Sequence, residues 1–278
     1  MVTHYIPKTL IETLDILNDH TAKIIAGGTD LMVQKRGWAN TAPNFDSTVN
    51  IIHLKELDYI REESESIHIG STTSLTDILI SSLTPPLLKD AIKEIASPAI
   101  RNMATIAGNI GNASPAGDTL PILYVLDAKV HIISKHVNRI LNISDVILGP
   151  RKTVLNKEDI IKEIIIPKAS FTHTEFKKVG GRKADAISKL SFTGAVSMQD
   201  DIITDFRVAF GAVGPTMVRV KELEQGIIGK TTHDVQKELT QIIDLYDPFI
   251  TPIDDQRSNQ EYRKKVSLNL LRDFIQSL

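Results

Sequence analysis

The chain contains no cysteine among its 278 residues. It therefore cannot form a disulfide, use a thiolate nucleophile or bind an iron–sulfur cluster through cysteine. Its eight histidines show no i, i+4 pair and a single Glu-x-x-His pattern, at 65–68. A di-iron site needs two such patterns, so we expect no zinc or di-iron site. If the protein carries out redox chemistry, the electrons must therefore be carried by an organic cofactor.

The chain also lacks an excess of either charge and any long apolar run. It has 32 basic and 34 acidic residues, for a net charge of -2, so we expect neither nucleic acid nor an anionic membrane as a partner. No apolar stretch is long enough to cross a bilayer, and the N-terminus has no basic region followed by an apolar one. The sequence therefore predicts a cytoplasmic, globular protein without a secretory signal.

A glycine-rich loop follows an apolar run near the N-terminus. Ile24, Ile25 and Ala26 read as a short strand that leads into Gly-Gly-Thr-Asp at 27–30. Backbone amides exposed by glycine can surround a diphosphate. The pattern is not the G-x-G-x-x-G motif of the doubly wound dinucleotide-binding fold. The alternative is a plain turn that ends a strand.

A second segment, TIAGNIGNASPAGD at 105–118, is rich in small residues and in short hydrogen-bonding side chains. Glycines at 108 and 111 allow a ligand to approach the backbone closely, and Pro115 and Pro121 interrupt regular structure. The segment therefore predicts a second ligand-binding loop, with an ordinary surface loop as the alternative.

The remaining pattern indicates an α+β fold. In the N-terminal part we expect helices at 10–17, from Ser74 to 80 and at 88–96, and strands near 24 and at 49–54, 66–70, 123–133 and 163–167. In the C-terminal part we expect antiparallel strands at 171–179, 191–198 and 202–210, a turn at Asp200-Asp201, a helix at 233–246 and a final helix after a capping box at 258–261. A polar turn near 167–170 predicts two domains, 1–168 and 169–278, with a subdivision of the first near residue 57.

Seven motifs in one order resemble the FAD-binding medium subunit of the molybdenum hydroxylases, the xanthine dehydrogenase and carbon monoxide dehydrogenase family. They are AGGTD at 26–30, IRNMATIAGNI at 100–110, ASPAGD at 113–118, GPRKT at 149–153, RKADAIS at 182–188, FGAVGP at 210–215 and DDQRS at 254–258. The resemblance covers essentially the whole chain. It implies a two-part FAD-binding domain of the PCMH type, followed by an antiparallel sheet packed with helices, as in the CO dehydrogenase flavoprotein C-terminal domain.

The resemblance also implies a function and partners. The chain would be a FAD-dependent oxidoreductase subunit that takes electrons from an iron–sulfur subunit and passes them to an acceptor such as NAD+. A molybdopterin-binding large subunit would act on the substrate. Because position 29 is Thr and the chain has no cysteine, we expect the FAD to be bound non-covalently. No residue of this chain is expected to be catalytic, and none to bind a metal.

The family pattern assigns cofactor contacts residue by residue. The first loop would give its amides, with the hydroxyl of Thr29, to the FAD diphosphate, and the second would contact the diphosphate and ribityl chain. Asp118 would accept hydrogen bonds from cofactor hydroxyls, Ile161 would lie near the adenine, and Lys177 would lie near the cofactor, although Lys177-Lys178 leaves the register open. The implied cofactor-binding residues are Ile25, Ala26, Gly27, Gly28, Thr29, Asp30, Leu31, Thr105, Ala107, Gly108, Asn109, Asp118, Ile161 and Lys177.

Two other functions fit parts of the pattern. A stand-alone FAD oxidoreductase of the same fold would need an acid–base residue of its own in the C-terminal domain, and no His, Tyr or Glu cluster stands out there. A non-catalytic interaction module would use the glycine loops only as turns. Arg101, Arg151 and Arg182 can pair with carboxylates or face a partner, and their positions in the sequence do not choose between the two.

Overall fold

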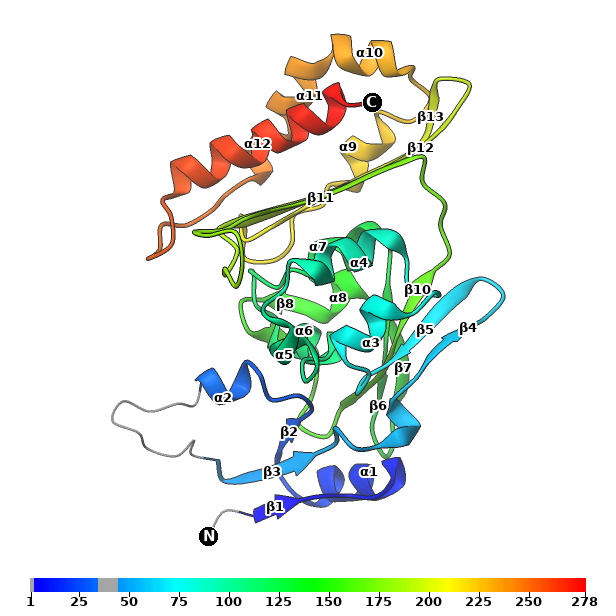
Figure 1. Ribbon diagram of the computed structural model, residues 1–278, viewed down its shortest axis with the longest axis vertical. Helices are drawn as coiled ribbons and strands as arrows, with labels where there is room; N and C mark the ends of the chain where they lie inside the picture. The colour runs from blue at the N-terminus through cyan, green and yellow to red at the C-terminus, as the bar shows by residue number, and fades with distance from the viewer. Residues whose placement is uncertain (1–2, 35–44) are drawn as a thin grey trace. The chain divides into compact units, whose positions relative to one another are not determined.

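A computed structural model describes residues 3–34 and 45–278. The chain divides into two compact units (Figure 1). The first contains the described residues up to Thr84, together with Ala96–Ala113 and Ala128–Pro167. The second contains Pro85–Ile95, Ser114–Asp127 and Lys168–Leu278. Two segments from the first 168 residues thus group with the C-terminal part, and the predicted boundaries at 168 and near 57 remain predictions.

The first unit holds two sheets. A small parallel sheet has the order β1 (Thr3–Tyr5), β3 (Ser47–Asn50) and β2 (Lys23–Ile25), and α1 (Leu10–Asp19) packs beside β3. A five-stranded antiparallel sheet has the order β4 (Ile60–Glu62), β5 (Ser66–Gly70), β10 (Ile160–Pro167), β6 (Lys129–Ile133) and β7 (Asn138–Asn142).

Apolar side chains from both sheets share one core, which contains Leu17, Val49, Leu54, Ile133 and Ile160. The short helices of this unit are α2 (Leu31–Gln34), η1 (Lys55–Leu57), α3 (Leu75–Ile80), α5 (Pro98–Arg101), α6 (Ile106–Asn112) and α8 (Ile143–Val146), and a hairpin joins β8 (Ile147–Gly149) to β9 (Lys152–Thr153). Ser74 begins α3 as predicted, because its hydroxyl accepts from the amide of Asp77 at 3.0 Å.

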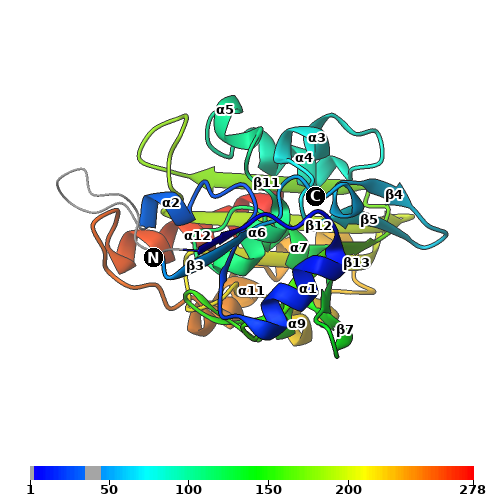
Figure 2. The ribbon, with the colours of Figure 1, turned by 90° about the horizontal axis from the view of Figure 1, so that it is seen from below.

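The second unit is built on the antiparallel sheet β11 (His173–Val179), β12 (Leu190–Gln199) and β13 (Ile202–Gly211). Figure 2 shows these strands side by side in that order. The predicted strands and the turn at Asp200-Asp201 are confirmed, and both turn residues have positive φ, at 49° and 64°. Apolar and polar residues alternate along much of β12 and β13 in the sequence, which made these strands readable. The first seven residues of β12 are nevertheless all buried.

Helices cover both faces of this sheet (Figure 1). One face carries α4 (Pro86–Lys93) and α7 (Leu120–Val125), and the other carries α9 (Lys221–Gln225), α10 (Thr232–Lys237), α11 (Leu239–Tyr246), η2 (Asp247–Phe249) and α12 (Gln260–Gln276). Phe192 and Phe210 face each other across β12 and β13, and the ring of Phe274 from α12 packs against Phe192 at a centroid distance of 5.5 Å. These aromatic rings form the centre of the second core.

Three predicted elements differ from the structure, and so does the cap of the last helix, which is Asn259 instead of Ser258. The strands expected at 123–133 are confirmed only at 129–133, which is β6. Residues 120–125 form helix α7, because Pro121 lies in the first turn of a helix, where no amide is needed. Every residue of this helix is buried, so no alternation of apolar and polar residues marks it in the sequence. Residues 106–112 form helix α6 inside the segment expected to be a loop. The helix expected at 233–246 is two helices that meet at Glu238.

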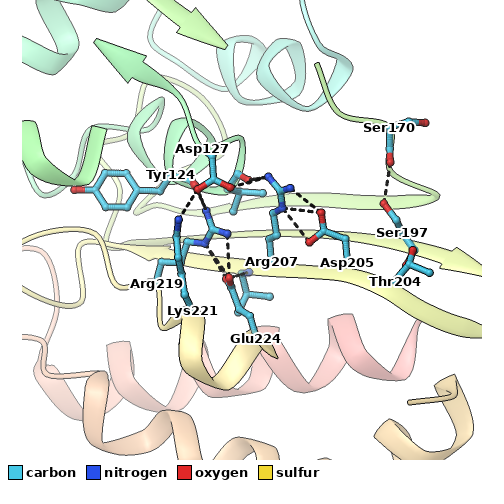
Figure 3. Close-up of polar contacts among 12 residues, drawn as sticks. Tyr124, Asp127, Ser170, Ser197, Thr204, Asp205, Arg207, Arg219, Lys221 and Glu224 are labelled. Atoms are coloured by element: carbon cyan, nitrogen blue, oxygen red, sulfur yellow. Dashed lines mark hydrogen bonds and ion pairs between the residues drawn. The ribbon is translucent and has the colours of Figure 1, made fainter. Parts of the chain in front are cut away.

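A partly buried ion network ties the end of α7 to β13 and α9 (Figure 3). The Arg219 Nη1 atom lies 2.9 Å from Asp127 Oδ1, and its Nε atom lies 2.9 Å from Glu224 Oε1. Arg207 pairs with the other Asp127 oxygen at 2.9 Å and donates to the Val125 carbonyl at 3.0 Å. The last carbonyls of a helix lack partners inside it, so these guanidinium groups hold the C-terminal turn of α7 in place.

Candidate functional site

The first predicted loop leaves β2 at Ile25 and enters α2 at Leu31. Gly28 has a φ of +68°, a left-handed conformation that favours glycine. Gly27 is required for a different reason, because a Cβ atom at this position would lie 1.7 Å from the carbonyl oxygen of Met103 and 3.1 Å from the Cα atom of Ala104. The loop therefore packs directly against the backbone that leads into α6.

The second predicted loop begins as helix α6. Thr105 is its N-cap, and its hydroxyl oxygen accepts from the amide of Gly108 at 3.0 Å. The Asn109 amide donates to the Thr105 carbonyl at 3.1 Å. Ala107 lies buried in the first turn and is not among the residues with positive φ. A methyl group at this position therefore causes no backbone strain.

The two loops bring unpaired backbone amides together. In the part of the chain that the structure describes, the N–H groups of Ala107 and of the five consecutive residues 27–31 have no hydrogen-bond partner. Backbone donors left in this way need an acceptor from outside the chain, either water or a ligand. A group with several anionic oxygens matches a set of donors without basic side chains, as in backbone anion sites. The residues present thus fit a diphosphate.

Two predicted residues lie in ordinary strand positions in the first unit. Ile25 pairs with Asn50 at the end of the parallel sheet. Ile161 pairs with Ile132, next to an irregularity in β10, and its exposed fraction is 6%. Burial in a sheet explains an isoleucine at position 161 without any ligand, so the adenine contact expected there remains a prediction.

Asp118 lies in the second unit, where protein groups already hold its carboxylate. Lys178 Nζ lies 2.8 Å from Oδ2, and the Ser188 hydroxyl donates to Oδ1 at 2.5 Å. Burial raises the pKa of Asp118, against the opposing effect of these two partners. Each oxygen keeps a second lone pair, so the carboxylate can still accept a hydrogen bond from a ligand.

The structure distinguishes between the two adjacent lysines. Lys177 is 53% exposed and pairs with Glu175 at 2.9 Å, whereas Lys178 is 6% exposed and donates to both Asp118 and the Glu94 carbonyl. Successive residues of a strand point to opposite faces, so only one of the pair can reach Asp118. The contact of Lys177 with the cofactor stays a prediction, and no role was predicted from the sequence for Lys178, whose ion pair with Asp118 the structure shows. Strand alternation implies that only one of the two lysines can pair with Asp118, but only the position of Asp118 in the fold shows that this lysine is Lys178.

In residues 3–34 and 45–278, no group of three or more His, Asp or Glu side chains has an arrangement that could hold a metal ion. Within the same ranges, no helix is both long enough and apolar enough to span a membrane.

Comparison with known proteins identifies the class of this fold. Residues 1–169 match the family described as the FAD binding domain in molybdopterin dehydrogenase, and residues 175–278 match the CO dehydrogenase flavoprotein C-terminal domain. These matches define a flavoprotein whose cofactor is FAD. The chain belongs to the family of FAD-binding subunits of the molybdenum hydroxylases and is an oxidoreductase subunit, as its motifs predicted.

Individual relatives agree with this assignment. The chain is 30% identical over 266 residues to the glyceraldehyde dehydrogenase medium chain of Sulfolobus acidocaldarius. The aligned region covers 93% of this chain and 92% of the relative. It is 34% identical over 238 residues to the nicotinate dehydrogenase FAD-subunit of Eubacterium barkeri, covering 81% and 79%. A chain of CO dehydrogenase from Oligotropha carboxidovorans superposes with a TM-score of 0.89 at 22% identity, covering 99% of this chain and 96% of that chain. This structural likeness confirms the α+β fold class.

Proposed function

We propose that this chain takes electrons from a partner iron–sulfur subunit onto FAD and passes them to an acceptor such as NAD+, in a cytoplasmic complex with a molybdopterin-binding large subunit. Its relatives are called medium chains and FAD-subunits of dehydrogenases, which supports a subunit of a larger enzyme. The complete absence of cysteine supports a division of labour in which another chain holds any iron–sulfur cluster. FAD, when bound, accepts and donates electrons either singly or in pairs.

The diphosphate of FAD is proposed to bind between the loop at 25–31 and the start of α6. One observation carries this proposal: the five consecutive amides 27–31 lack partners among the described residues and are fixed beside α6 by the close approach of Gly27 to Met103. Ala107 adds a sixth donor. Thr29, Thr105, Gly108 and Asn109 complete the proposed contacts around this point. The roles of Asp118, Ile161 and Lys177 remain as the sequence predicts them.

Flavin content tests the site. The purified full-length chain is expected to be yellow and to release FAD on denaturation. Gly27→Ala places a methyl group where the Met103 carbonyl lies, so the two loops must separate and most of the flavin is expected to be lost. Gly181→Ala is the matched control outside the two loops, because a Cβ atom there meets nothing within 4 Å.

The expected result is flavin retained by Gly181→Ala and lost by Gly27→Ala, with the strands of the second unit still folded by circular dichroism. A Gly27→Ala protein that keeps its full complement of FAD would contradict the assignment of the loops.

Purification of the tagged chain from its native cells tests the partners. We expect iron, acid-labile sulfide and molybdenum to copurify in separate polypeptides, and the complex to reduce NAD+ when a substrate of the molybdenum subunit is supplied. If the chain instead purifies alone with FAD and oxidises a substrate by itself, the proposal of an electron-transfer subunit is wrong and a stand-alone oxidoreductase is correct.

A further inference from the structure

A polar network in the first unit connects two of the seven sequence motifs, AGGTD and GPRKT, to the end of α6. The Arg151 Nη1 atom lies 2.9 Å from Asn112 Oδ1 and 3.5 Å from Asp30 Oδ2. Gln34 Nε2 donates to the same Asn112 oxygen at 2.7 Å and also to Asp30. Asp30 follows the glycine loop, Asn112 ends α6, and Arg151 lies in the turn between β8 and β9. One guanidinium group therefore connects both proposed diphosphate-binding segments.

The backbone of Arg151 is unusual for an arginine. Its φ is +57°, in the left-handed region where glycine is favoured. Its amide donates to the Ala113 carbonyl at 2.9 Å, which fixes the turn against the end of α6. Glycine would adopt this conformation with less strain, and it too has an amide to donate. The contacts that the Arg151 side chain makes are therefore what distinguishes it from glycine at this position.

The charge of Asp30 indicates the role of the Arg151 side chain. Its carboxylate belongs to the loop whose amides we propose hold a diphosphate, and two anions at short range repel each other. In the described part of the chain, the cation that pairs with Asp30 is Arg151. The Asp30 and Arg151 side chains are 50% and 53% exposed, so the pair contributes little to folding. The pair instead changes the net charge of the loop at 27–31 and fixes its position.

We infer that Arg151 is a positioning residue for the flavin diphosphate. Its guanidinium group holds Asp30 and Asn112 together, fixes the loop at 27–31 against α6, and neutralises the carboxylate that would otherwise repel the ligand. This inference rests on the proposed function of that loop. It assigns a role to the GPRKT motif, which carried none in the sequence.

Titration of the flavin-free full-length protein with FAD, followed by quenching of flavin fluorescence, measures the effect. Arg151→Gly removes the guanidinium and also relieves the strained φ, so the flavin-free protein is expected to be no less stable than wild type in thermal unfolding. FAD binding is nevertheless expected to weaken about tenfold. Arg151→Lys keeps the charge and is expected to recover most of the affinity. Lys152→Ala, the exposed neighbour in the same hairpin, is the control and should bind FAD as wild type does.

A double-mutant cycle with Asp30→Asn separates positioning from a general structural role. If Arg151 acts through the Asp30 charge, Arg151→Gly should weaken FAD binding by less than about threefold in the Asp30→Asn background. An equal loss in both backgrounds, or an Arg151→Gly protein that binds FAD as tightly as wild type, overturns the inference and leaves the proposed site intact. A wild-type protein that binds no FAD overturns the proposed function and this inference with it.

Discussion

Single residues show how burial decides the role of a charge. Lys177 and Lys178 are adjacent and chemically identical, yet one is mostly in water and the other is enclosed with Asp118. A buried ion pair gives little net stabilisation against desolvation, but removing one partner leaves an uncompensated charge. An exposed pair such as Lys177 with Glu175 contributes almost nothing.

We therefore expect Lys178→Ala to lower the free energy of unfolding of the second unit by about 3 kcal/mol or more, and Lys177→Ala to change it by less than about 0.5 kcal/mol. Urea unfolding monitored by circular dichroism measures both. The double variant Asp118→Asn/Lys178→Met is expected to recover part of the loss, because neither charge remains buried alone. Equal effects of the two lysine substitutions would show that the ion pair with Asp118 is not what stabilises this region.

At the scale of elements, the five-stranded sheet carries a buried carboxylate at its centre. Glu163 on β10 is 4% exposed and lies 2.9 Å from His131 Nδ1 on β6, 3.0 Å from His68 Nδ1 on β5 and 2.8 Å from the Tyr59 hydroxyl. Burial by itself would raise the pKa of Glu163. Hydrogen bonds from His131, Tyr59 and His68 outweigh it and lower the pKa from 4.5 to about 2. One side chain thus joins three strands through its charged form.

This lowered pKa makes the stability of the sheet depend on pH. The native state favours the ionised carboxylate, so the stabilisation is complete above pH 4.5 and is lost as the pH falls towards 2. The loss is at most about 3 kcal/mol. Glu163→Gln should be less stable at neutral pH and should show a smaller change across this window.

Urea unfolding from pH 2 to 7 checks this prediction, with Glu65→Gln, an exposed residue of the β4–β5 hairpin, as the control. Glu163→Gln unfolding with the pH dependence of the wild type would mean that other carboxylates cause it.

Helices α6 and α7 depend on contacts with the rest of the chain. Each is short, at 7 and 6 residues, and too short to be stable alone. Glycines in α6 lower its helix propensity, and α7 is apolar on every side. A local cap at Thr105 begins α6, and the helix then packs against β10. In α7, arginines from β13 and from the segment after it hold the last turn.

At the scale of the whole molecule, the order of segments in the sequence differs from the way they group into compact units. Residues 85–95 and 114–127 leave the N-terminal part of the sequence and pack in the second unit, where α4 and α7 cover one face of the β11–β13 sheet. The second proposed binding segment therefore crosses from one unit to the other at Ala113–Ser114.

Hydrogen exchange in the whole chain distinguishes the proposed site from the rest of the molecule. The amides at 27–31 have no partner in the described structure and should exchange quickly without ligand. Saturation with FAD at 100 times its dissociation constant is expected to slow them by up to about 100-fold. The ladder between β12 and β13, already paired, serves as the internal reference. Protection that appears elsewhere while 27–31 remain fast would place the diphosphate at another site.

The sequence by itself determined the family, the cofactor and the α+β class. Seven motifs in order are read without coordinates, and the strands at 173–179, 190–199 and 202–211 follow from alternation that does not depend on distant contacts. Zero cysteine is also a property of composition alone. Each of these signals is local, so local information was enough.

Only the tertiary structure decided which lysine meets Asp118, why Gly27 is glycine and what Arg151 does. Each answer depends on residues far apart in the sequence: Lys178 with Asp118, Gly27 with Met103, and Arg151 with Asp30. The short period of a strand or a helix carries no information about such partners. Burial, charge pairing and close backbone approach are set by the packed chain, and they determine the contacts on which the proposed site depends.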